Sequence, residues 1–344
     1  MRILVTRFSS IGDVALCVPL MEALYRQHND LDITFVSRPQ FRSLFEPIGI
    51  EFVGAELNGQ HQGLQGLYRL SRELSSHHKP EKLVDLHDVL RTRILGGLLR
   101  LKGIGTYRLN KGRAKKRALT RRYNKVRGPL AHTIERYQMA FVRAGIPVRL
   151  AVDRPELPDY RSEKADRAWK QLGFSGPVVG FAPLAAHPGK TLPWEQSVAL
   201  VERLSQLKVE TLLFGGPEER ALLEGLSVDN AFVKLAPADL SFGEEVALMK
   251  RLKAMISMDS ANMHLAALAD IPVVSIWGAT HADAGFGPVG QPAHLQVAIS
   301  TDELSCRPCS VYGNKSCFRK DYACLNRITT DMILQKVTPL LEQN

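Results

Sequence analysis

The chain alternates, twice over, between short runs of branched apolar residues and longer segments with apolar residues at helical spacing. In the first half the runs read as strands at 2–8, 32–38, 50–56 and 81–88, separated by expected helices such as 14–24 and 64–78. The second half repeats the alternation, with expected strands at 176–183, 209–216, 231–237, 254–258 and 271–278. Strands that alternate with helices predict βαβ units and a parallel sheet. The sequence therefore predicts an α/β protein built from two doubly wound, Rossmann-like domains.

The length of 344 residues suits two domains at ~100–200 residues each. A proline-containing stretch, 148–160, follows the last expected helix of the first half and is the predicted linker. We expect an N-terminal domain at 1–155, a C-terminal domain at 156–328 and a closing helix within 329–344, interrupted at Pro339.

The apolar segments are too short for membrane insertion. No run approaches the ~18 apolar residues of a membrane span. The opening sequence is interrupted by Arg7 and Asp13 and does not read as a signal peptide. A cytoplasmic location is therefore expected.

Positive charge is concentrated in one segment. The chain carries a net charge of +10, and residues 89–133 hold fourteen Lys and Arg but no Asp or Glu. A local cationic segment indicates an anionic partner, which could be nucleic acid, anionic lipid or a phosphorylated glycan; a merely solvated face is the alternative. Nucleic acid is disfavoured, because Tyr107 and Tyr123 are the only aromatic residues in the segment available for base stacking. We expect residues 110–128 to form a mobile loop or an exposed helix.

Ligands of open α/β sheets bind at the carboxyl ends of the strands, where helix N-termini face them. This rule selects four loops as candidate sites: 9–13, 183–190, 215–219 and 259–264. In the first loop, Asp13 is a candidate general base or a helix N-cap, and Ser10 and Gly12 would let an anion or sugar approach closely. The G-x-G-x-x-G pattern of a dinucleotide site is absent from it.

The other loops carry groups suited to a sugar diphosphate. Asp259, Ser260 and the backbone from Ala261 could hold a ribose or diphosphate, with His264 one turn into the helix or simply buried in the core. Lys190 could neutralise a diphosphate or be solvated. Glu218 and Glu219 could bind ribose hydroxyls or only stabilise a helix start.

Four cysteines, Cys306, Cys309, Cys317 and Cys324, have the spacing C-x2-C-x7-C-x6-C. Only the first pair has tight zinc-like spacing. Free or packed thiols are favoured over a bound metal, and disulfides are the third alternative.

Taken together, these motifs resemble glycosyltransferase family 9, the lipopolysaccharide heptosyltransferases. The resemblance is carried by RILVTRFSSIGDVALCVPLMEAL near the start and MISMDSANMHLAALADIPVVSIWGAT later on, with VVGFAPLAAHPGKTLPWE, LLFGGPEE and CRPC between and after them. It extends over about residues 1 to 340. The turn after Asp259 reads Ser-Ala-Asn where the family commonly has a glycine, so the donor stays open.

The resemblance implies a GT-B fold, with two Rossmann-like domains facing across a cleft and a C-terminal helix that crosses back to the first domain. It implies an inverting transferase without a catalytic metal or other cofactor, which moves heptose from ADP-heptose to a lipopolysaccharide inner-core acceptor. Asp13 would be the base, with Ser10, Gly12 and Arg91 on the acceptor side. The donor would contact Lys190, Glu218, Asp259, Ser260, Ala261 and His264. The expected partners are this donor, an anionic lipid-linked acceptor and, peripherally, the inner face of the membrane.

Two other functions remain open from the sequence. A nucleic-acid-binding protein would use the cationic residues of 91–127, and it would bind DNA or RNA with steep salt dependence. A related nucleotide-sugar enzyme, such as an epimerase, would turn over a nucleotide sugar without an acceptor.

Overall fold

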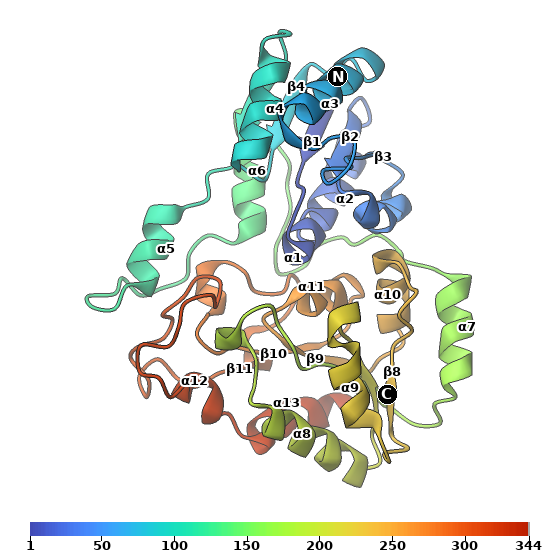
Figure 1. Ribbon diagram of the computed structural model, residues 1–344, viewed down its shortest axis with the longest axis vertical. Coiled ribbons are helices and arrows are strands. Elements are labelled where there is room, and N and C mark those ends of the chain that lie inside the picture. The colour runs from blue at the N-terminus through green and yellow to red at the C-terminus, as the bar shows by residue number, and fades with distance from the viewer. Residues whose placement is uncertain (343–344) are drawn as a thin grey trace. The chain divides into compact units, whose positions relative to one another are not determined.

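The computed structural model describes residues 1–342 and divides into two compact units (Figure 1). Unit 1 contains residues 1–112, 132–159 and 241–243, and unit 2 contains residues 113–131, 160–240 and those from 244 on. Each unit is built on its own sheet and is described by itself.

Unit 1 contains a five-stranded sheet in the order β3-β2-β1-β4-β5, and all of its neighbouring strands are parallel. Its strands are β1 (Arg2–Thr6), β2 (Asp32–Ser37), β3 (Glu51–Gly54), β4 (Lys82–Asp85) and β5 (Gly105–Arg108). The chain runs outward from β1 to β3 and then returns to the other side of β1 with β4. The switch point of the sheet therefore lies between β1 and β4, where Thr6 pairs with Asp85.

Helices pack on this sheet, because each has one apolar face to bury. The helices are α1 (Ile11–Ala15), α2 (Val18–Gln27), α3 (Gly63–His77), α4 (Leu90–Arg100) and α6 (Thr133–Arg143). α3 packs on α4, and α2 packs on α6. Leu70 and Leu74 of α3 and Leu95 and Leu99 of α4 bury their side chains with Leu83 of β4 in one core cluster.

Unit 2 contains a six-stranded parallel sheet in the order β11-β10-β9-β6-β7-β8. Its strands are β6 (Val178–Ala182), β7 (Glu210–Leu213), β8 (Val233–Leu235), β9 (Ala254–Met258), β10 (Val273–Ile276) and β11 (Gln296–Val297). This sheet also grows in one direction and then reverses, so that its switch point lies between β6 and β9. The predicted pair of doubly wound domains is thus confirmed, although the sequence analysis did not predict the edge strands β5 and β11.

The helices of unit 2 are α5 (Arg113–Thr120), α7 (Glu163–Leu172), α8 (Trp194–Gln206), α9 (Arg220–Ser227), α10 (Phe242–Met249), which begins in unit 1, α11 (Ala261–Leu268), α12 (Ala323–Asn326) and α13 (Thr330–Leu341). The closing helix α13 packs on α8, β9 and β10 in unit 2, whereas the resemblance placed it on the first domain. It runs on through Pro339, which was expected to interrupt it. Pro339 lies in the last turn, so the hydrogen bond that it cannot donate to the carbonyl of Gln335 is lost only near the end of the helix.

The cationic segment differs most from expectation. The fourth expected strand, β4, is followed by α4 and then by β5, which the sequence analysis did not predict. Residues 113–131 then belong to unit 2 and not to the N-terminal domain predicted at 1–155. Within residues 1–342, no helix is both long and apolar enough to span a bilayer.

Candidate active site

The sequence-predicted site residues lie at the switch points of the two sheets. In unit 1, the loop at residues 9–13 follows β1 and the turn at residues 86–89 follows β4. In unit 2, the loop that carries Lys190 follows β6, and Asp259 directly follows β9. Neighbouring strands that lead away from each other leave a crevice at this edge, which is where doubly wound sheets bind ligands.

Asp13 is the third residue of α1 and not its N-cap, because the helix begins after Ser10. The backbone N–H and the hydroxyl of Ser10 both donate to Oδ2 of Asp13, at 3.4 and 2.9 Å. The buried Gly12 directly precedes Asp13 in the same turn. Capping therefore accounts for part of the role of Asp13, and the same contacts hold its carboxylate in one orientation.

Arg7 provides the charge partner of Asp13. The two side chains form an ion pair through Nη2 and Oδ2, with 8% and 22% of each side chain exposed. Nη1 of Arg7 donates to the carbonyl of Leu86 at 2.6 Å, and the guanidinium lies 6.0 Å from the ring centre of Tyr137. Burial alone would lower the pKa of Arg7, but Tyr137 and Asp13 outweigh it and raise the pKa. Arg7 is therefore a permanent cation beside the candidate base.

His87 is a residue of this site that the sequence reading did not select. It follows β4, its Nε2 lies 3.5 Å from the hydroxyl of Ser9, and its ring meets that of Phe8 edge-on at 6.2 Å. Burial, with the nearby cations Arg7, Lys111 and Arg91 as the further causes, lowers its pKa to about 3. His87 is thus a neutral imidazole at physiological pH. Its position beside the loop at residues 9–13 follows from the pairing of β4 with β1, which no local pattern indicates.

The turn that carries His87 is fixed by two acidic residues. Oδ1 of Asp85 accepts the backbone N–H groups of His87 and Asp88, at 2.8 and 2.9 Å. Asp88 binds the guanidinium of Arg93 through both of its oxygens. Arg91, predicted on the acceptor side, is half-buried in the first turn of α4 and is close enough to lower the pKa of His87. The switch point of unit 1 thus brings together a carboxylate, a neutral imidazole and several cations.

In unit 2 the structure brings together two of the predicted donor residues. Nζ of Lys190 lies 2.9 Å from Oδ2 of Asp259, and only 17% and 7% of the two side chains are exposed. The lysine comes from the loop after β6 and the aspartate from the end of β9, so that the pair bridges the switch point. A lysine fixed in this way presents a positive charge at one place for a diphosphate.

The helix after Asp259 begins as the sequence predicted. Ser260 is the N-cap of α11, and its hydroxyl lies 3.2 Å from that of Ser257. Ala261 is the first residue of the helix, and the backbone N–H groups of this first turn have no carbonyl partner inside the helix. His264 is buried in the same helix. The first turn of α11 therefore supplies donors beside Lys190.

The two glutamates after β7 have different environments. Oε2 of Glu219 accepts the backbone N–H of Gly216 at 2.7 Å and so stabilises the start of the following helical turn. Glu218 is exposed. Glu219 therefore stabilises the start of a helical turn, and Glu218 remains a predicted contact of the donor.

The segment that carries the four late cysteines, residues 306–324, packs against the loop of Lys190. Gly313 has a φ of +74°, and a side chain there would place its Cβ 2.5 Å from Cγ of Lys190. The buried Arg307 fixes the segment by donating to the carbonyls of Gly278 and Trp277, at 2.7 and 3.0 Å. The segment is therefore part of the same site as Lys190.

The cysteines of this segment are free thiols: Cys306, Cys309, Cys317 and Cys324. Burial raises the pKa of Cys324 to about 12 and also raises the pKa of Cys306 and Cys309. Among residues 1–342, no group of three or more His, Cys, Asp or Glu side chains is arranged to hold a metal ion.

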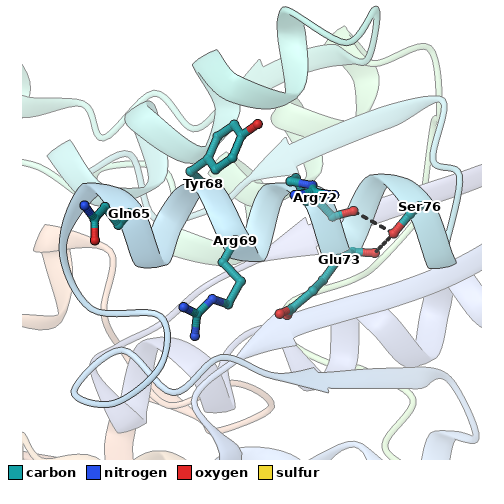
Figure 2. A pocket seen from close by; sticks show the side chains of 6 residues that line it. All are labelled: Gln65, Tyr68, Arg69, Arg72, Glu73 and Ser76. Atoms are coloured by element: carbon teal, nitrogen blue, oxygen red, sulfur yellow. Dashed lines mark hydrogen bonds between the residues drawn. The ribbon is translucent and has the colours of Figure 1, made fainter.

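A surface pocket lies elsewhere, along α3 (Figure 2). Its volume is about 410 Å³, and its lining residues are Gln65, Tyr68, Arg69, Arg72, Glu73 and Ser76. All six come from one helix, and their side chains project from it without converging on a common point. None is a predicted site residue, so the pocket does not change the assignment of the site.

Comparisons with known proteins agree with the fold. The sequence profile of glycosyltransferase family 9 (heptosyltransferase) matches residues 99–317. Lipopolysaccharide heptosyltransferase 2 of Salmonella typhimurium is 26% identical over 163 residues, which are 44% of this chain and 47% of that protein. The chain thus spans about half the length of this curated relative.

Solved structures extend the likeness to the whole chain. A family 9 glycosyltransferase from Veillonella parvula has a TM-score of 0.76 at 19% identity, covering 99% of this chain and 97% of that one. The E. coli heptosyltransferase WaaC with ADP has a TM-score of 0.67 at 17% identity, covering 99% and 100% of the two chains. At such identities these structures show the fold, which is GT-B. The family match covers well over half of the chain, which therefore belongs to glycosyltransferase family 9, the heptosyltransferases.

Proposed function

We propose that this glycosyltransferase moves heptose from ADP-heptose to an inner-core sugar of lipopolysaccharide, with inversion and without a metal. The observation that carries the proposal is the Lys190–Asp259 pair beside the first turn of α11. A fixed cation and a row of backbone donors suit the diphosphate of a nucleotide sugar. The similar E. coli heptosyltransferase WaaC was solved with ADP, which supports an ADP-type donor.

In this proposal the two switch points divide the chemistry. Asp13 takes the proton from the acceptor hydroxyl, whose oxygen attacks the anomeric carbon of the donor. The bond between that carbon and the diphosphate breaks, and ADP leaves with the electron pair. Lys190 and the N–H groups from Ala261 on stabilise the charge that develops on the diphosphate, in the place that a divalent cation takes in other enzymes.

The remaining predicted residues take binding roles in the proposal. Asp259 orients Lys190 through their ion pair, and Ser260 and His264 belong to the same wall of the donor site. Glu218 contacts the nucleoside. Ser10, Gly12 and Arg91 lie on the acceptor side, where the cations around His87 would attract an anionic, lipid-linked glycan. A peripheral position at the inner face of the membrane completes the proposal.

A thermal-shift series with ADP, UDP, GDP, CMP and ADP-heptose tests the donor. A ligand that binds only the folded state raises the melting temperature in proportion to ln(1 + [L]/Kd). We expect shifts with ADP and ADP-heptose alone. A shift selective for another nucleotide would replace the donor, and no shift with any of the five would contradict the proposal.

A transfer assay then separates the transferase from a nucleotide-sugar enzyme that needs no acceptor. ADP release from ADP-heptose should depend on an added heptose-deficient lipopolysaccharide core. Conversion of the donor to another nucleotide sugar in the absence of any acceptor would favour an epimerase and overturn the transferase assignment.

A further inference from the structure

The cationic segment contains a compact surface element, which we call the basic finger and define as residues 113–127. It consists of α5 and the loop that follows, and it belongs to unit 2 (Figure 1). The finger holds eight Lys and Arg and no Asp or Glu. Such a density of one charge needs a structural or a functional explanation.

One face of α5 is explained by packing within unit 2. Lys116, Leu119 and Thr120 are buried, and Nζ of Lys116 lies 3.9 Å from the ring centre of Phe286. The opposite face is exposed. Three cations of this face and the one that directly follows the helix make no ion pair or side-chain hydrogen bond within residues 1–342: Arg113, Lys115, Arg117 and Arg121.

The loop after α5 exposes apolar side chains in a fixed conformation. Tyr123 and Val126 are 70% and 59% exposed. On either side of Val126, Lys125 donates to the carbonyl of Pro308 and Arg127 donates to the carbonyl of Thr301 at 3.4 Å. The exposed apolar side chains therefore stand on an anchored loop.

A second aromatic residue extends the tip. The guanidinium of Arg122 lies 5.3 Å from the ring centre of Tyr123 and 4.6 Å from that of Phe318, which is 43% exposed. Aromatic rings and an aliphatic side chain set among cations are typical of proteins that bind at the membrane–water interface.

We propose that the basic finger docks unit 2 on an anionic phospholipid surface. Arg113, Lys115, Arg117 and Arg121 contact the headgroups, and Tyr123 and Val126 enter the interfacial layer. The composition favours a bilayer over nucleic acid. Arg122 lies over the ring of Tyr123, where a base would have to stack, and the exposed Val126 suits an apolar layer and not a nucleic acid. The inference deepens the peripheral membrane position given under the proposed function and rests on it.

Electrostatics sets the expected size of the effect. A Lys or Arg near an anionic surface contributes about 1 kcal/mol, which corresponds to about fivefold in the partition coefficient. Neutralising the four exposed cations should therefore weaken binding about 10³-fold at low salt. Raising the ionic strength should weaken binding of the wild type by screening the same charges.

Co-sedimentation with vesicles tests the proposal on the full chain. The vesicles are phosphatidylcholine alone or with ~30% phosphatidylglycerol, a fraction chosen to give a negative surface potential. The wild type should bind the anionic vesicles only. The variant R113Q/K115Q/R117Q/R121Q should lose this binding, and Y123S/V126S should lose about tenfold.

A matched control neutralises four other exposed cations of unit 2 that have no ion pair within the described residues, K170Q/R203Q/K208Q/R327Q. This variant has the same net charge as the finger variant and should keep most of the binding. Equal loss in both variants would overturn the finger as the docking site, as would equal binding of the wild type to neutral vesicles. Steeply salt-dependent binding to DNA or RNA without vesicle binding would also overturn it, in favour of a nucleic-acid partner.

The readout needs neither donor nor acceptor. Vesicle binding can therefore fail while ADP still raises the melting temperature, which would refute the finger and leave the proposed transfer reaction intact. Melting temperatures of the variants, with and without ADP, show that they are folded.

Discussion

Replacement of Asp13 by asparagine should reduce turnover far more than it reduces binding. A positioned general base contributes about 10²–10⁴-fold to the rate, so loss of the base should lower kcat about 10³-fold, or about 4 kcal/mol in the barrier. The amide keeps the shape of the carboxylate and can still accept the bonds from Ser10. Donor binding should hold, because the proposed donor contacts Lys190 and Asp259 lie in loops of unit 2.

The same substitution should lower stability, since it removes the anion from a buried guanidinium. Only 6% of Arg7 is exposed, and Asp13 is its ion-pair partner. Breaking a buried pair costs about 3–5 kcal/mol, and the 22% exposure of the Asp13 side chain places the expected loss at or below about 3 kcal/mol.

The assay follows ADP release at saturating acceptor, well below the melting temperature of the variant. Kd for ADP is measured in parallel by calorimetry. D331N is the matched control, because it makes the same change at an exposed aspartate in the first turn of α13. If D13N keeps a kcat within tenfold of the wild type while D331N is unaffected, Asp13 is only a capping residue.

Three further predictions concern the donor site, acid stability and core packing. Lys190→Met should raise Kd for ADP about 10–150-fold, the loss of one charge-assisted contact, and an unchanged calorimetric Kd would remove Lys190 from the diphosphate site. His87 should make the protein less stable in acid, because its pKa of about 3 in the folded state lies below the 6.5 of the unfolded chain. The free energy of unfolding should therefore fall between pH 6.5 and pH 3 by up to about 1.4 kcal/mol per pH unit. Urea titrations should show this slope reduced in His87→Gln, and identical slopes would contradict the burial of a neutral imidazole. Gly180→Ala should cost about 1–3 kcal/mol, since its Cβ would lie 2.5 Å from Sδ of Met255; a melting temperature equal to that of the wild type would show that this core can relax.

The sequence was sufficient for the features that depend on local patterns. The strand–helix alternation predicted both sheets except for β5 and β11, and the rule that ligands bind at the carboxyl ends of strands selected the loops of Asp13, Lys190 and Asp259. Their residue types were informative because a carboxylate, a lysine and a helix start each have a definite chemistry toward sugars and phosphates. The ion pair between Lys190 and Asp259 depends on β6 pairing with β9, which was implied by the doubly wound fold but not by either motif alone.

Features that depend on long-range pairing were missed. His87 carries no motif, and it reaches the loop of Asp13 only because β4 adds beside β1. β5 has four residues and lies in a segment rich in cations, so it shows no apolar pattern that would predict a strand. The sequence predicted an exposed segment at α5, because no local pattern indicates that Lys116 packs on the ring of Phe286, far away in the chain.

Gly313 limits how the C-terminal segment can change. Its left-handed backbone and its contact with the aliphatic part of Lys190 leave no room for a side chain at this point. Exchanging the segment between Arg307 and Ala323 with that of a relative would therefore alter the proposed donor site, even though most of the exchanged residues lie on the surface. A chimaera that keeps a glycine in register with Gly313 should retain ADP binding, whereas one with any other residue there should displace Lys190 and lose it.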